Sequence, residues 1–252
     1  MYFNDIHILY YVVFAILGLI VGEIIGKFDE KIIDNKTKDK KKNDANTENK
    51  KVIKYHYLFM IFTAIIYVFL LYKYGLQKEM INNVELIQYI ILTPFLLSVI
   101  HIDKELKIIP NRLVLTLFEI GIFFIFIYGI YDINIALNRL VGLLIGAGIF
   151  LAITLIGNLI SGKETMGYGD VKLIGALGLY FGMTKIMILS ITSFLIGAVI
   201  SIILMIVRRK KMDEYIAFGP FISLASFTLM FIPFNTVLQM LLKIFTLGLY
   251  NA

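Results

Sequence analysis

The chain has 252 residues, of which 59% are hydrophobic and 17% are charged, and its formal net charge is +6. Soluble domains are usually about 45–50% apolar, so this composition predicts an all-α integral membrane protein rather than an aqueous fold. Because cysteine is absent, disulfides, thiolate metal sites and cysteine nucleophiles are excluded together. The positive charge is explained by the placement of basic loops beside a membrane, so it implies no nucleic acid partner.

Apolar segments recur along the whole chain, and most have the roughly 17–25 residues that cross hydrocarbon. The pattern predicts about eight transmembrane helices, and 173–182 is short enough to be either a tightly packed helix or a re-entrant one. A final amphipathic piece near 236–250 lies in or on the membrane. The candidate spans are 8–26, 56–72, 86–102, 113–131, 140–160, 173–182, 186–207 and 216–232.

Basic residues predict how these spans are oriented. Four segments that follow alternate spans, 27–55, 103–112, 163–172 and 208–211, hold 19 of the 24 lysines and arginines. Alternating spans place all four on one side, which the positive-inside rule makes cytoplasmic. We therefore expect a multi-pass protein of the cell membrane with its N-terminus outside.

Composition divides the chain into two segments. Residues 1–85 contain the first two spans and the Lys/Asn-rich segment 27–55, which has too few apolar residues to bury a core. We expect 27–55 to be a flexible cytoplasmic loop, either a solvated linker or an anchor to anionic lipid. Residues 86–252 are expected to form a six-helix core that carries the acidic pair described next.

Two aspartates lie where predicted spans meet the cytoplasm. Asp103 closes the third span and Asp170 opens the sixth, so both are expected at the same depth. Acidic side chains at membrane edges are costly if they face lipid, and they usually face a cavity or one another. Interfacial solvation is the alternative for each aspartate taken alone.

The neighbours of each aspartate favour a site. Gly167 and Gly169 flank Tyr168 just before Asp170, and glycines allow a turn with positive φ that brings backbone close to an extended peptide. Beyond Asp103, the loop ends at Pro110-Asn111 before the next helix begins.

Two carboxylates brought together share one proton, so one acts as a base and the other as an acid. The base would deprotonate a water that attacks a peptide carbonyl, and the acid would protonate the oxyanion and then the leaving amine. This chemistry needs no metal and no cofactor. The positive end of a helix dipole favours Asp170 as the ionised partner.

At these residues the sequence resembles the type IV prepilin peptidases, membrane aspartyl proteases with a G-x-G-D signature. The resemblance covers roughly 86–232, and it implies that Asp103 and Asp170 are the catalytic pair. The implied substrates are prepilins or pseudopilins, whose short basic leader is cut on the cytoplasmic side before a hydrophobic helix. The pieces that carry the resemblance are Asp103 with Ile109-Pro110-Asn111, then 166-MGYGDVKL-173 and 218-FGPF-221.

Three further side chains near the motifs have two readings each. Lys172 could position Asp170 or neutralise its charge, or it could be an ordinary snorkelling residue. Glu105 and Glu164 could pair with a basic leader peptide, or they could simply be solvated.

The resemblance has one departure. Many bacterial relatives carry paired C-x-x-C motifs in the first cytoplasmic loop and also methylate the new N-terminus with S-adenosylmethionine. Here 27–55 holds no cysteine, so a thiolate zinc site is impossible, and S-adenosylmethionine is implied only if methylation is retained. The particular pilin-like substrate and the oligomeric state are open.

Three other functions remain as alternatives. A G-x-G-D protease of the presenilin or signal-peptide-peptidase type would cut inside a transmembrane helix. A transporter would use edge carboxylates to relay ions, although such proteins often show internal repeats. A non-catalytic scaffold of a secretion assembly would tolerate the loss of Asp170.

Overall fold

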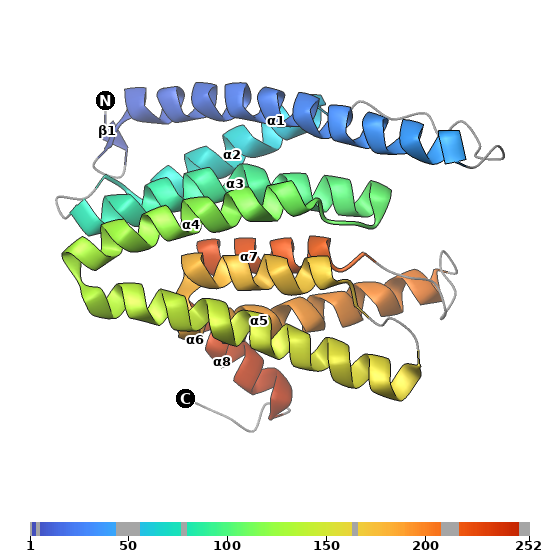
Figure 1. Ribbon diagram of the computed structural model, residues 1–252. Helices are drawn as coiled ribbons and strands as arrows, with labels where there is room; N and C mark the ends of the chain where they lie inside the picture. Colours follow the sequence, from blue (N-terminus) through green and yellow to red (C-terminus); the bar gives the residue numbers. More distant parts are fainter. Residues whose placement is uncertain are drawn as a thin grey trace. The chain divides into compact units, whose positions relative to one another are not determined.

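A computed structural model describes residues 2–3, 6–43, 56–76, 80–162, 166–207 and 217–246. Apart from a short antiparallel ribbon of β1 (Tyr2–Phe3) and β2 (Ile6–His7), these residues form helices and their connections (Figure 1). The helices are α1 (Ile8–Asn43), α2 (His56–Tyr74), α3 (Met80–Leu106), α4 (Asn111–Tyr131), α5 (Ile133–Ser161), α6 (Tyr168–Ile206), α7 (Gly219–Phe231) and α8 (Phe234–Phe245).

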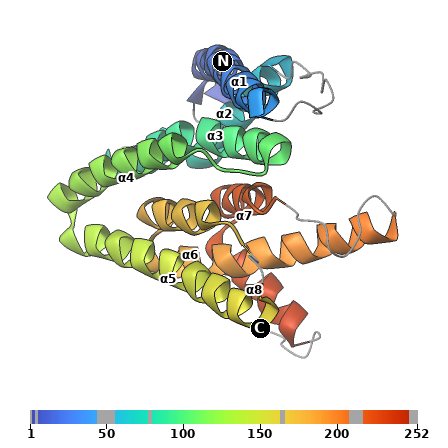
Figure 2. The ribbon, with the colours of Figure 1, turned by 45° about the vertical axis from the view of Figure 1, so that its right-hand side comes forward.

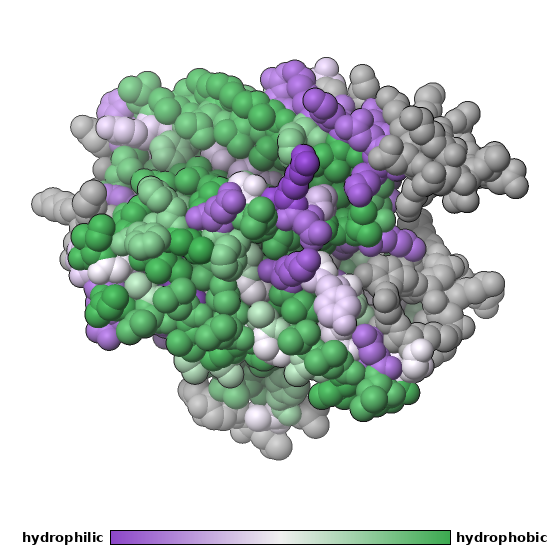
Figure 3. All heavy atoms as spheres, viewed as in Figure 1, coloured by the Kyte–Doolittle hydropathy of each residue, from purple (hydrophilic) through white to green (hydrophobic). Residues whose placement is uncertain are grey.

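Within the described residues, α1 to α6 are six helices long and apolar enough to cross a membrane. Large apolar side chains are exposed on these helices, and Figure 3 shows them spread over much of the visible face. Ile130, for example, is 90% exposed, which water would penalise and lipid tails accept. The expectation of an all-α polytopic membrane protein is confirmed. The side on which the N-terminus lies stays a prediction.

The chain forms two compact units, Met1–Leu106 and Lys107–Ala252. This geometric boundary falls after α3, whereas the segments predicted from composition meet at residue 85. The third helix therefore packs with the first two in the structure. The functional division of the chain stays a prediction.

In the first unit, α1 and α2 pack closely because glycines line their contact. A Cβ at Gly18 would lie 2.5 Å from the Ala64 Cα atom, and one at Gly22 would lie 2.6 Å from the Met60 Cα atom. These pairings run in opposite chain directions, so the two helices are antiparallel. The Tyr67 hydroxyl then donates to the Ile90 carbonyl at 2.9 Å and joins α2 to α3.

The first helix is longer than the sequence predicted. It continues to Asn43, so the expectation of a loop is wrong for residues 27–43, and residues 44–55 lie outside the described part of the chain. The charged residues here suit a helix: Lys27 pairs with Glu23 one turn earlier at 2.6 Å. Asp29 and Ile33, also one turn apart, are both buried and give this extension an inward face.

In the second unit, α6 is a helical hairpin. Its backbone leaves the helical region at Gly182, where φ is 74° and ψ is 176°. Ile174 and Ile186, on either side of this break, both contact the position of Gly146 on α5. Figures 1 and 2 agree that the chain reverses there, from the yellow-orange segment to the orange one. The predicted short helix 173–182 and the span 186–207 are thus the two arms of one hairpin.

Two adjacent residues of α5 hold the hairpin closed. The buried guanidinium of Arg139 donates to the carbonyls of Leu179, at 3.1 Å, and of Tyr180, and so caps the end of the first arm. The Asn138 side chain accepts from the Met183 backbone N–H at 2.8 Å and caps the start of the second arm. Both arms are therefore fixed to the same point of α5.

Phenylalanines fasten α7 to this hairpin. The Phe218 ring lies 5.0 Å from that of Phe194 on α6, 5.9 Å from that of Phe150 on α5 and 5.6 Å from that of Phe221, measured between centroids. The segment 218-FGPF-221 therefore has a packing role at the start of α7. Pro220, within this segment, lies in the first turn of α7, where proline is well tolerated.

Candidate active site

Asp103 lies in the last turn of α3 and is only 3% exposed. Its helix ends three residues later, and Lys107 follows with a φ of 55°. This left-handed residue turns the chain toward Pro110, which has extended backbone and precedes α4. The Asp103 side chain is therefore surrounded by protein rather than by solvent.

A second carboxylate, that of Asp29, is buried against residues of α3 that precede Asp103 by a few positions. Sequence reasoning missed it. Asp29 of α1 is fully buried and accepts a hydrogen bond from the Ser98 hydroxyl of α3. The His101 Nδ1 atom lies 3.5 Å from the other Asp29 oxygen, and the Phe59 ring packs on the imidazole at 5.1 Å. We call Asp29, Ser98 and His101 the Asp29 cluster. The signal for it was Asp29 and Ile33 at helical spacing inside a segment dominated by lysine.

The Asp29 cluster contains the residue types of a nucleophilic triad but not its arrangement. In a triad the serine hydroxyl is hydrogen-bonded to the imidazole, which removes its proton. Here the hydroxyl of Ser98 donates to the carboxylate instead. The cluster is therefore a buried polar contact between α1 and α3 and is not a nucleophile.

Asp170 lies in the first turn of α6 and is also only 3% exposed. Its backbone N–H donates to the Gly167 carbonyl at 3.0 Å, which closes the turn. At this end of a helix the backbone dipole favours a negative charge. The neighbouring Tyr168 is 53% exposed and so is available to a ligand rather than to the core.

The glycines before Asp170 serve a different purpose from the one predicted. Gly167 has φ −71° and ψ 137°, and Gly169 is part of the helix, so the expectation of a turn with positive φ is wrong. Gly169 is instead a point of close approach. A Cβ there would lie 3.3 Å from the Ile109 Cβ atom, so the absence of a side chain lets the 107–110 connection lie against the start of α6.

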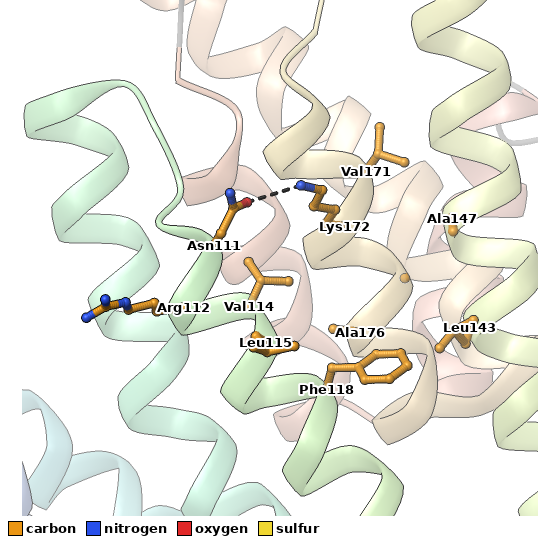
Figure 4. Close-up of a pocket in the computed structure, with 11 residues that line it drawn as sticks. Asn111, Arg112, Val114, Leu115, Phe118, Leu143, Ala147, Val171, Lys172 and Ala176 are labelled. Carbon is orange, nitrogen blue, oxygen red and sulfur yellow. Dashed lines mark hydrogen bonds between the residues drawn. The ribbon is translucent and has the colours of Figure 1, made fainter.

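Lys172 is tied to the same connection. Its ammonium group donates to the Asn111 side-chain oxygen at 3.1 Å, and both side chains are exposed (Figure 4). Asn111 begins α4 directly after Pro110. The residues picked out as motif support, Pro110, Asn111, Gly169 and Lys172, thus lie together at one end of the second unit.

A groove begins at this end. It has a volume of about 500 Å³, and eight of the eleven residues that line it are apolar or small (Figure 4). Lys172 and Asn111 lie at its polar end, and Val171 directly follows Asp170. The lining residues are Asn111, Arg112, Val114, Leu115 and Phe118 of α4, Leu143 and Ala147 of α5, and Val171, Lys172, Gly175 and Ala176 of α6.

The remaining predicted site residues are the two glutamates expected to contact the substrate leader. Glu105 is half-buried in the last turn of α3, and Glu164 lies outside the described residues. Among the residues that the structure describes, no three His, Asp or Glu side chains are grouped so that they could hold a metal ion. Asp103 belongs to the first compact unit and Asp170 to the second.

Several known proteins are similar to this chain. Prepilin leader peptidase/N-methyltransferases are 31% identical over 136 residues in Aeromonas salmonicida and 33% identical over 139 residues in Legionella pneumophila, each covering 54% of this chain and 46% of the relative. The Neisseria gonorrhoeae protein with the same name is 28% identical over 176 residues, which cover 70% of this chain and 57% of the relative. The chain thus spans about half the length of the curated relatives it matches. No solved structure matches it.

The matched segment contains both aspartates. It begins inside α3, includes α4 and α5, and ends in the second arm of α6. The resemblance predicted from Asp103, Ile109-Pro110-Asn111 and Gly167 to Asp170 is therefore confirmed: residues 90–202 match the type IV leader peptidase family.

Proposed function

We propose that this chain is a membrane aspartyl endopeptidase that removes the basic leader peptide of prepilins or pseudopilins at the cytoplasmic face. The observation that carries the proposal is the burial of two carboxylates, Asp103 and Asp170, at helix ends within a segment that matches the leader peptidase family. Buried acids at span edges are expensive, and they are kept where they do chemistry or meet a partner.

The connection after Asp103 supports the pairing of the two aspartates. Ile109 lies against Gly169, and Asn111 binds Lys172, so this connection is fastened on both sides of Asp170 in sequence. Asp103 precedes Ile109 by six residues, part of them helical, and a chain of that length reaches at most about 20 Å. The length of this connection is therefore compatible with the proposed pairing.

In the proposed mechanism the pair holds one proton and one water. Asp170, favoured as the anion by its place at a helix N-terminus, removes a proton from the water as it attacks the scissile carbonyl. Asp103 donates its proton to the carbonyl oxygen, which gives a gem-diol. Asp170 then passes the proton that it took from the water to the leaving amine nitrogen. As the C–N bond breaks, a gem-diol hydroxyl returns a proton to Asp103, so that a carboxylic acid and a free amine are released. Neither a metal nor a cofactor takes part in these steps.

The groove beside Lys172 suits the part of the substrate that follows the cut. A prepilin has a hydrophobic helix directly after its leader, and the groove offers an apolar wall that starts one residue from Asp170. Small residues at Ala147, Gly175 and Ala176 let another helix come close, as small residues do between membrane helices. The basic leader would then lie on the solvent side, and we keep the expectation that the carboxylates of Glu105 and Glu164 pair with it.

The proposal is tested by co-expressing the chain with a candidate prepilin and measuring the mature N-terminus by mass spectrometry. We expect a cut between the leader and the hydrophobic segment, and loss of that product with Asp103→Asn or Asp170→Asn. Asp132→Asn is the matched control, because Asp132 caps α5 and asparagine caps a helix equally well.

The same spectrum separates the alternatives. A cut inside the hydrophobic segment would indicate a protease of the presenilin type, and unchanged processing by Asp170→Asn would indicate a scaffold. The mass of the new N-terminus also reports methylation. The relatives' names include N-methyltransferase, and an added methyl group would extend that activity, with S-adenosylmethionine as its donor, to a chain without cysteine.

A further inference from the structure

The Asp29 cluster links two helices that are distant in the sequence. Asp29 and Ser98 are 69 residues apart, and their hydrogen bond joins α1 to α3. Asp29 is fully buried, Ser98 is 4% exposed and His101 is 7% exposed. The leader peptidase match begins at residue 90, so it contains Ser98 and His101 but not Asp29.

Stability alone is a weak reason for such a cluster. Taking a carboxylate out of water costs several kcal/mol, and the interactions with its buried partners offset only part of this cost. Apolar side chains of similar size often stabilise a core better. Buried polar contacts of this kind are best known for fixing the register of neighbouring helices. We therefore expect the Asp29 cluster to fix the register of α3 relative to α1.

The part of α3 that the cluster holds is its C-terminal end, which carries Asp103. His101 precedes Asp103 by two residues and Ser98 precedes it by five, which are about 3 Å and 7.5 Å along the helix axis. The bond from Tyr67 to Ile90 fixes α3 much farther back, about 20 Å from Asp103. The cluster opposes a turn or slide of the last two turns of α3, and such a movement would displace the Asp103 carboxylate directly.

We propose that Asp29, Ser98 and His101 are positioning residues that hold the Asp103 carboxylate in register for catalysis through the link between α1 and α3. This inference rests on the proposed function, since it needs Asp103 to act in the cleavage. None of the three residues touches the reacting atoms. Their effect passes through the helix that carries Asp103.

Cleavage kinetics of a prepilin peptide by full-length protein in detergent test the inference. Asp29→Asn keeps the size of the side chain and an oxygen for Ser98 but removes the charge. We expect its kcat to fall about 10- to 100-fold, since a displacement of about 1 Å costs this much, while KM stays within about twofold. Tyr67→Phe is the matched control, because it also removes one buried link to α3, and we expect its kcat to change little.

A second readout reports position without activity. The chain has no cysteine, so Asp103→Cys and Asp170→Cys can be introduced together and their cross-linking by a short bifunctional thiol reagent followed in membranes. We expect Asp29→Asn to slow this cross-linking several-fold and Tyr67→Phe to leave it unchanged. If Asp29→Asn does not accumulate, Ser98→Ala, which removes only the hydroxyl, gives the same two readouts.

Two results overturn different statements. Asp29→Asn or Ser98→Ala variants that match Tyr67→Phe in both kcat and cross-linking, while Asp103→Asn is inactive, would refute the positioning role alone. Full cleavage by Asp103→Asn would instead refute the proposed function. A folded Asp29→Asn protein with low kcat, unchanged KM and slow cross-linking supports the inference.

Discussion

At the residue scale, Asp103 and Asp170 share two properties, their place at a helix end and an exposure of only 3%. Two such groups that act on one water form a single catalytic unit. Removing either member then removes the whole contribution of the pair, so the effects of the two changes are not additive.

This gives a kinetic prediction for the pair. Asp103→Asn and Asp170→Asn should each abolish nearly all cleavage, and the double variant should be scarcely slower than either single one. The measurement is single-turnover cleavage of a prepilin peptide at matched amounts of folded protein. Free energies of activation that simply add would show that the aspartates act independently.

The groove leads to a second prediction at this scale. Leu115 is 57% exposed and lines the groove, so Leu115→Trp should fill part of it with little effect on the core. We expect kcat/KM for a prepilin with its hydrophobic segment to fall about tenfold, the order expected when a pocket is altered by one side chain. Leu144→Trp, at a 68% exposed position of α5 that is not part of the groove, is the control. Equal kcat/KM values for the two variants would show that the groove does not bind the substrate.

At the element scale, the α6 hairpin determines where Asp170 lies, because Asp170 begins its first arm. Its reversal depends on Gly182, whose combination of φ 74° and ψ 176° is open almost only to glycine. Gly182→Ala should destabilise the protein by about 1–3 kcal/mol. Gly148→Ala is the control, since a Cβ there has open space and alanine favours a helix. Denaturation in detergent measures both, and equal midpoints would contradict the role of Gly182.

The Arg139 cap gives a further test of the hairpin. Arg139 donates to two carbonyls at the end of the first arm, and its guanidinium lies 3.9 Å from the centre of the Tyr128 ring. Arg139→Met should lower the free energy of unfolding by roughly 2–4 kcal/mol, from charged hydrogen bonds and a cation–π contact. The exposed Arg112→Met should change it by less than about 0.5 kcal/mol. Similar losses for both variants would argue against the cap.

Most helices could be predicted because hydrophobicity decides them, and each apolar run found in the sequence corresponds, over most of its length, to helix in the described residues. The hairpin shows the limit of this reasoning. Gly182 was visible as one of three glycines in a short segment, but the reversal depends on Asn138 and Arg139, which are far away in sequence. The extension of α1 to Asn43 was missed because low apolar content was taken as a loop signal, although a helix needs only one buried face.

The site could be predicted where its residues form a local motif. Asp103, Asp170 and the Pro110-Asn111 corner follow from short patterns, and the structure adds the contacts that hold that corner to α6. Gly169 was recognised as important for the wrong reason, since close approach to Ile109, and not positive φ, requires it. For the Asp29 cluster, the helical spacing of Asp29 and Ile33 was a signal for a buried face of α1, but nothing local pairs Asp29 with a serine 69 residues later.

At the scale of the whole molecule, the account depends on Asp103 of the first compact unit working with Asp170 of the second. Ile109 and Asn111, which follow Asp103 in the chain, contact Gly169 and Lys172 on either side of Asp170 in the sequence.

The most direct test is cross-linking of Asp103→Cys with Asp170→Cys in membranes by a short bifunctional thiol reagent. Asn111→Cys with Lys172→Cys is the positive control, since these side chains are in hydrogen-bond contact. We predict that the aspartate pair cross-links as efficiently as the control pair. A control pair that reacts fully beside an aspartate pair that does not react would show that the two acids never meet, and the proposed mechanism would be wrong.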